Sequence, residues 1–245
     1  MMGRKWTQDD VVTYNIKVVY QDLMTFFGMT DLPPANVESD ALVAKDLASA
    51  QGYWTSNMLF HMDYATDPDN RESGTIDFVR EVFHLLRYAN TAQNRVVMVR
   101  WKLRYLATQG KCPQVDVCIL DDSNVISLVV KVDRNSPGFD PEARLISEAI
   151  AAFENDNVWR KERLGITPLA GMVMPGIVMD GTTPTFYKIP VTSELVSAIK
   201  YGKQPEQETI VYAYRPEVPR PGEGMRLLDN RRIILSAFEA FRQFL

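Results

Sequence analysis

Residues 114–134, QVDVCILDDSNVISLVVKVDR, decide the fold of this chain. In both halves of this stretch, apolar residues alternate with other residues, as they do in half-buried β-strands. The polar run at residues 121–124 (DDSN) separates the two halves and has the composition of a tight turn. The stretch therefore predicts a β-hairpin at the centre of a sheet.

Three charged residues lie on this predicted hairpin. Asp116 is on the first strand, and Lys131 and Asp133 are at the end of the second. Because side chains in a strand alternate between faces with a period of two, Lys131 and Asp133 project from the same face. Antiparallel pairing can bring Asp116 close to both. Since unpaired charges are costly on a buried sheet, these three residues predict a functional site.

The residues on either side of the hairpin predict a helix, a third strand and a second helix. From Glu72 onward, apolar residues recur with the period of a helix of about four turns. Residues 95–107 alternate as a long strand, which completes an antiparallel three-stranded meander. Its predicted inward face consists of Val97, Val99, Trp101, Leu103 and Tyr105. Asp140 followed by Pro141 predicts the start of another helix, which runs to about residue 155.

The C-terminal part of the sequence predicts a second hairpin and further helices. Asp180-Gly181 is a hairpin signal between two apolar stretches, residues 169–179 and 185–191. A short helix to about Tyr201, a strand at 209–214, a proline-rich link and an amphipathic helix at 229–245 follow. We expect the last helix to dock on the core of the same molecule.

This order of elements predicts an α/β or α+β fold, with a central mixed sheet flanked by helices. We expect residues 1–70 to form an N-terminal lobe or extension, mostly irregular from 35 to 70 with a short helix at 40–50. Residues 71–215 form the predicted core. Residues 216–245 contribute the link and the closing helix, packed on that core.

The composition restricts the classes of function. The chain has 245 residues and a net charge of −4, and its pI is about 5.3. Proteins that coat nucleic acid without sequence preference are usually basic, so any nucleic-acid role needs a local basic patch. The two histidines and two cysteines do not form a zinc-type cluster.

The sequence also indicates a compartment. Cys112 and Cys118 are too few for a disulfide framework and favour a reducing environment. The N-terminus lacks the apolar region of a secretory signal, and no stretch is long and apolar enough to span a membrane. We therefore expect a cytoplasmic or nuclear protein.

With an acid on the second strand and a charged pair ending the third, the predicted core resembles the PD-(D/E)XK nuclease superfamily. In particular it resembles the restriction-endonuclease-like proteins that are numerous in mushroom-forming fungi. The resemblance covers roughly residues 72–191, and the closing DNRRIILSAFEAFRQFL is also similar to that fungal set. It implies a restriction-endonuclease-like fold and Mg²⁺-dependent phosphodiester hydrolysis, in which acids hold the metal and a lysine positions or activates water.

The resemblance assigns roles to individual residues, but the order of two of them is reversed. Asp116 matches the first acid, and Glu72 or Glu81 is the assisting glutamate of the preceding helix. Lys131 stands where the family has its second acid, and Asp133 stands where the family has its lysine. Sliding the alignment by two residues keeps the lysine but loses the acid.

Two arrangements of these residues remain open. In the first, Asp116 and Asp133 hold one Mg²⁺ and Lys131 assists, with the roles exchanged along the strand. In the second, Lys131 pairs with Asp116 and the charges are structural, because a shift of two residues along a strand moves an acid by about 6–7 Å. The first arrangement predicts an active nuclease. The second predicts a nuclease-like protein without catalysis that binds a protein or a nucleic acid.

A basic strand face lies before the hairpin. Arg100, Lys102 and Arg104 alternate with apolar residues and are therefore expected on one face. They either follow a phosphate backbone or form an ordinary solvated strand face.

Overall fold

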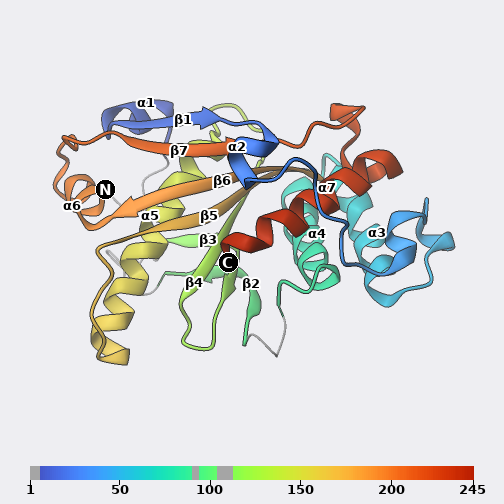
Figure 1. Ribbon diagram of the computed structural model, residues 1–245, viewed down its shortest axis with the longest axis horizontal. Helices are drawn as coiled ribbons and strands as arrows, with labels where there is room; N and C mark the ends of the chain where they lie inside the picture. Colours follow the sequence, from blue (N-terminus) through green and yellow to red (C-terminus); the bar gives the residue numbers. More distant parts are fainter. Residues whose placement is uncertain (1–5, 90–93, 104–112) are drawn as a thin grey trace.

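The computed structural model describes residues 6–89, 94–103 and 113–245. Among them a seven-stranded mixed sheet forms the centre of the molecule, in the order β1-β7-β6-β5-β4-β3-β2 (Figure 1). The strands are β1 (Ile16–Tyr20), β2 (Val96–Lys102), β3 (Gln114–Leu120), β4 (Ile126–Val132), β5 (Gly171–Asp180), β6 (Thr183–Thr192) and β7 (Thr209–Tyr214). The predicted α/β class, a mixed sheet flanked by helices, is confirmed.

The pairing of the strands follows from the connections between them. β2, β3 and β4 form the predicted antiparallel meander. β4 and β5 are parallel, so the chain crosses over between them through a helix. β5 and β6 form the predicted hairpin, in which Gly181 adopts a positive φ of 55° in the turn. β7 pairs with β6 in antiparallel fashion and with β1 in parallel fashion at the other edge.

Helices cover both faces of the sheet. They are α1 (Gln8–Thr13), α2 (Leu23–Phe27), α3 (Tyr53–Thr66), α4 (Arg71–Leu85), α5 (Pro141–Trp159), α6 (Ser193–Tyr201) and α7 (Leu228–Phe241). The buried residues of α2, α3, α4 and α7 join one apolar core, and those of α1, α5 and α6 join a second core on the opposite face. Short helical turns lie at Ser39–Leu42, Leu47–Ser49, Arg160–Leu164, Pro221–Arg226 and Arg242–Phe244.

An aromatic cluster anchors the C-terminal helix α7 to the sheet. Phe186 of β6 is fully buried, and its ring centroid lies 5.0 Å from that of Phe238 and 4.8 Å from that of Phe241. Phe26 of α2 also stacks on Phe241, with 6.4 Å between the ring centroids. The expectation that this helix docks within its own molecule is confirmed.

The region before α4 differs from the expected irregular segment. The predicted short helix at 40–50 is wrong, since this region contains two 3₁₀ turns. Helix α3, of 14 residues, was not predicted. Its sequence hides the amphipathic pattern because Tyr53, Phe60 and Tyr64 are exposed on the side away from the core.

The first strand of the meander also differs in detail. Arg100 has a φ of 50°, in the left-handed region that a side chain rarely adopts. The alternation changes at this point: Val97 and Val99 pack against the α4-side core, whereas Trp101 packs against the α5-side core. The single inward face predicted for this strand is therefore wrong. Arg104 and Tyr105 lie outside the described residues.

Two further findings concern membrane-spanning helices and the cysteines. No helix in the described ranges is long and apolar enough to cross a bilayer. Cys118 of β3 is a buried free thiol, and burial raises its pKa. Cys112 lies outside the described residues.

We expect Phe186→Ala to lower the free energy of unfolding by about 3–5 kcal/mol, because it leaves a cavity between the sheet and α7. The matched control is Phe60→Ala, which removes a ring that is 46% exposed and should cost less than about 1 kcal/mol. Urea denaturation measures both values. Equal losses in the two variants would contradict this description of the core.

Candidate functional site

Three ionisable side chains meet between the hairpin and α5. Lys131 of β4 places its Nζ 2.9 Å from Asp116 Oδ2 on β3 and 2.7 Å from Glu148 Oε1 on α5. Lys131 is 4% exposed and Asp116 is 6% exposed. The ammonium therefore lies between two carboxyl groups in the interior. We call these three residues the Lys131 cluster.

Two contacts to β4 fix the position of Asp116. The ladder between β3 and β4 runs as far as the pair Val117 and Val130. Beyond this pair, Asp116 Oδ2 accepts the backbone N–H of Val132 at 3.0 Å. A side-chain oxygen thus takes the place of a backbone acceptor. Asp116 is held both by this bond and by Lys131.

The electrostatics of the cluster keep Lys131 charged and raise the pKa of the buried Glu148. Burial lowers the pKa of Lys131, but attraction to Glu148 and Asp116 outweighs burial and raises the pKa overall. Burial raises the pKa of Glu148 to about 8; the charge of Asp116 adds to this, and Lys131 opposes it. Glu148 Oε2 is buried and has no hydrogen-bond partner among the described residues, so it is the oxygen available to carry a proton.

An aromatic ring lies beside the cluster. The centroid of Phe139, in the loop after β4, lies 6.0 Å from Lys131 Nζ. Arg144 of α5 stacks on the same ring at 3.9 Å, and Arg134 lies 5.4 Å from its centroid. These are cation–π distances. The loop and α5 together contribute to the low exposure of the cluster.

Among the described residues, the remaining side chains predicted for the site form no ion pair or hydrogen bond with the Lys131 cluster. Asp133 is half-buried, and its Oδ1 accepts the N–H of Asn135 at 2.8 Å. Glu72 is on α4, whose buried residues belong to the opposite core, and it forms an ion pair of 2.7 Å with Arg134. Glu81, the alternative to Glu72 as the assisting glutamate, is buried and accepts a hydrogen bond from Arg80 Nε at 2.9 Å.

The Lys131 cluster does not fit a Mg²⁺ ion. Mg²⁺ needs oxygen ligands around a vacant position, but here an ammonium group lies between the two carboxyl groups, and a divalent cation would meet its positive charge. Within the described ranges, no group of three or more His, Cys, Asp or Glu residues could hold a metal ion. Of the two arrangements left open by the sequence, the structure contains the Asp116–Lys131 ion pair.

The predicted basic strand face is described only in part. Arg100 and Lys102 are exposed on β2, which is an edge strand beside β3. Lys102 pairs in register with Gln114, two residues before Asp116. Arg104 lies outside the described residues. Two cations are thus available at the edge of the sheet next to the strand that carries Asp116.

Sequence reasoning missed Glu148. The signal for it was its position on α5: it comes three residues after Leu145 and directly before Ala149, both buried. An acid on the apolar side of an amphipathic helix needs a cationic partner or a proton. Asp156, two turns further along, is a second example. It is buried, accepts the N–H of Ile126 at 2.8 Å, and burial raises its pKa to about 7.

We expect Glu148→Gln to flatten the pH dependence of stability. Between its ordinary pKa of about 4.3 and its folded value of about 8, Glu148 is protonated in the folded state and ionised in the unfolded state. Raising the pH through this window therefore favours unfolding, by up to about 1.4 kcal/mol per pH unit. Glutamine keeps an oxygen for Lys131 and does not titrate.

The free energy of unfolding, measured in urea at several pH values between 5 and 8, checks this expectation for wild type and variant. The control is Glu154→Gln on the same helix. Glu154 forms a long ion pair of 3.8 Å with Lys200, whose side chain is exposed. Its profile should run parallel to that of the wild type. A Glu148→Gln profile that also runs parallel would show that Glu148 has an ordinary pKa.

No known protein-family model matches the chain, and neither does any curated protein sequence with which it was compared. The resemblance to the PD-(D/E)XK nucleases thus depends on the order of the elements and on the positions of Asp116, Lys131 and Asp133.

Proposed function

We propose that this chain is a nuclease-like protein without metal-dependent catalysis, which acts by binding a partner. The observation that carries the proposal is the position of the Lys131 ammonium, within 2.9 Å of Asp116 and 2.7 Å of Glu148. In the PD-(D/E)XK pattern that the sequence resembles, acids at this place hold Mg²⁺. Here an internal cation supplies the positive charge, and a second cation is not needed for neutrality.

Burial of the cluster supports the same proposal. A hydrolytic metal must reach water and a phosphodiester. Asp116 and Lys131 are 6% and 4% exposed, and the ring of Phe139 lies beside the ammonium. The alternative, an active Mg²⁺-dependent nuclease that uses Asp116 and Asp133, requires Lys131 to leave both of its partners.

Nucleic acid is the first candidate for the partner. Arg100 and Lys102 are exposed on the edge strand β2, and Lys and Arg side chains on one surface are the usual contacts to a phosphate backbone. The overall charge of −4 restricts such contacts to local surfaces.

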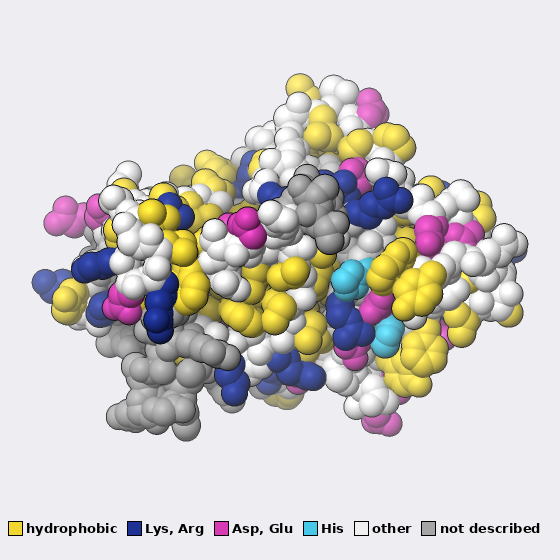
Figure 2. Space-filling model, turned by 90° about the horizontal axis from the view of Figure 1, so that it is seen from below, with side chains coloured by type: hydrophobic (Ala, Val, Ile, Leu, Met, Phe, Trp, Pro, Cys, Tyr) yellow, Lys and Arg dark blue, Asp and Glu magenta, His cyan; other side chains and the backbone are white. Residues whose placement is uncertain are grey.

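A protein partner is the second candidate, and a different surface favours it. Tyr53, Phe60 and Tyr64 recur at helical spacing along α3 and are 70%, 46% and 43% exposed. Figure 2 shows hydrophobic side chains at the right-hand end of the molecule, where α3 lies, with histidine side chains beside them. Trp54 stacks on His84 at 4.9 Å in the same region. Exposed aromatic side chains are enriched at protein interfaces.

We expect wild-type protein to show no saturable heat when Mn²⁺ or Mg²⁺ is titrated into it, and no metal-dependent cleavage of DNA or RNA. The double variant Lys131→Glu/Asp133→Lys restores the order acid, any residue, lysine. It should gain Mn²⁺ binding with a dissociation constant of about 1 mM or lower, because three carboxyl groups then surround a site without a cation. Calorimetry measures the binding, and thermal unfolding with and without Mn²⁺ checks that the variant folds.

Adding Asp116→Asn to the double variant is the control, and it should abolish the gained binding. Two results would contradict the proposal. The first is Mn²⁺ binding by wild type that disappears in Asp116→Asn. The second is metal-dependent cleavage by wild type that the same substitution abolishes.

A further inference from the structure

A cavity of about 480 Å³ lies at the N-terminal end of α7, on the side of the sheet opposite the Lys131 cluster. Four of the side chains that line it are cationic: Lys45, Arg220, Arg226 and Arg232. Among the described residues that line it, Asp229 is the only acid, and it pairs with Arg232 at 3.2 Å. In a chain with a net charge of −4, this is a concentrated positive surface.

Two buried polar residues of α7 hold this cavity together. Arg231 is 0% exposed and donates to Met225 O at 2.9 Å and to Ala44 O at 2.6 Å. Met225 and Ala44 directly precede Arg226 and Lys45 in the chain. Asn230 is also 0% exposed, and it bonds both the backbone N–H and the backbone C=O of Arg220, at 3.3 and 2.7 Å. One turn of α7 thus fixes the backbone beside three of the four cations.

The burial of the charged Arg231 side chain costs free energy, and this cost indicates that the arrangement has a specific role. Its acceptors are three backbone carbonyls, and among the described residues it has no carboxylate partner. Burial lowers its pKa to about 10, so it remains charged at neutral pH. Its Nη2 atom is buried without a hydrogen-bond partner in the described chain. Burying a guanidinium without a counter-ion is unfavourable, which makes an ordinary packing role a poor explanation.

The backbone of α7 adds to the positive potential. The helix has 14 residues and begins after Leu227 without a side-chain cap. The first N–H groups of a helix lack intrahelical acceptors, and the helix dipole places partial positive charge there. Leu227, Leu228 and Asp229 line the cavity. Four cationic side chains and free N–H groups around one cavity are the donor set that binds phosphate.

A second cavity of about 340 Å³ shares Arg226 with the first. Arg71, Arg215 and threonines of the β5–β6 hairpin line it, together with Asp180 and Glu223. Asp180 pairs with Arg71. Arg226 donates a hydrogen bond to the hydroxyl oxygen of Thr66 at 3.4 Å. Among the described residues it has no acidic partner. Arg226 is therefore available to an anion in either cavity.

We propose that the α7 cavity binds a phosphate group of a phosphate-bearing ligand, and that Arg226 extends the site toward a neighbouring phosphate. The phosphate belongs either to a small molecule or to a nucleic-acid backbone. This site lies apart from the Lys131 cluster, so it does not depend on the proposed loss of catalysis, and the two proposals fail separately.

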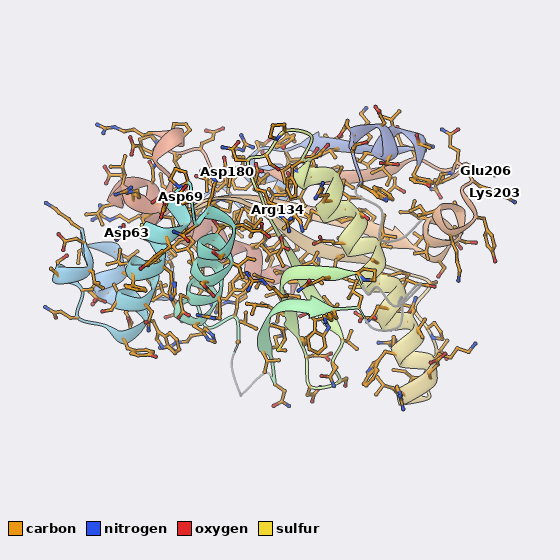
Figure 3. All side chains as sticks on the ribbon, turned by 180° about the vertical axis from the view of Figure 1, so that it is seen from behind. Asp63, Asp69, Arg134, Asp180, Lys203 and Glu206 are labelled. Carbon is orange, nitrogen blue, oxygen red and sulfur yellow. The ribbon has the colours of Figure 1, made fainter. Side chains whose placement is uncertain are left out.

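Calorimetric titration at low salt with two probes, sodium pyrophosphate and an unphosphorylated 12-nucleotide single strand, tests the proposal. The test variant is Arg220→Gln/Arg226→Gln, because both side chains are exposed and their removal leaves Asn230 and Arg231 in place. The control, Lys161→Gln/Lys203→Gln, removes the same charge from exposed positions. Lys203 lies at the end of the molecule far from α7 (Figure 3).

We expect the test variant to lose at least about tenfold in affinity and the control to stay within about twofold of wild type. Binding of pyrophosphate alone would support a small phosphate ligand, and binding of the oligonucleotide alone would support a nucleic-acid backbone; binding of both would support a site for either. The proposal is overturned if wild type binds neither probe. Equal losses of affinity in the test and control variants would also overturn it. They would show that the net charge attracts the probes without binding them at a specific site.

Discussion

The rest of the structure around the hairpin depends on one buried cation, the ammonium of Lys131 between Asp116 and Glu148. Removing an ammonium from water costs several kcal/mol unless partners replace the lost hydration. Asp116 and Glu148 supply these partners from β3 and α5, so one charge connects two strands and the helix that crosses over them. The same contacts explain why Asp116 and Glu148 do not fit a metal ion, because an ammonium group lies between them.

A second buried cation organises the opposite face. Arg231 binds backbone carbonyls at Ala41, Ala44 and Met225 instead of a carboxylate. It thereby ties α7 to segments far apart in the sequence, and no carboxylate among the described residues pairs with its charge. The two cations illustrate different uses of buried charge. Lys131 neutralises a cluster, whereas Arg231 holds the framework of a positive cavity.

The local patterns of the sequence were sufficient for β2 to β7, for α4 to α7 and for two members of the cluster, but not for β1 at the other edge of the sheet. A period of two placed Asp116 and Lys131 on paired strands. Glu148 could not be predicted in the same way, because it comes from a helix whose orientation is set by packing on the sheet. Helix α3 was missed because its exposed aromatic residues obscure the apolar stripe. The change of face at Arg100 depends on a backbone angle that alternation does not encode.

The most direct test of the central claim is anomalous diffraction at the manganese edge from crystals of the wild-type protein soaked in Mn²⁺. We predict density for the Lys131 ammonium between Asp116 and Glu148, with no anomalous peak bonded to either carboxyl group. A manganese peak bonded to Asp116 and Asp133, with the Lys131 side chain displaced, would contradict the account. It would show that the cluster is a metal site that this lysine occupies only when the metal is absent.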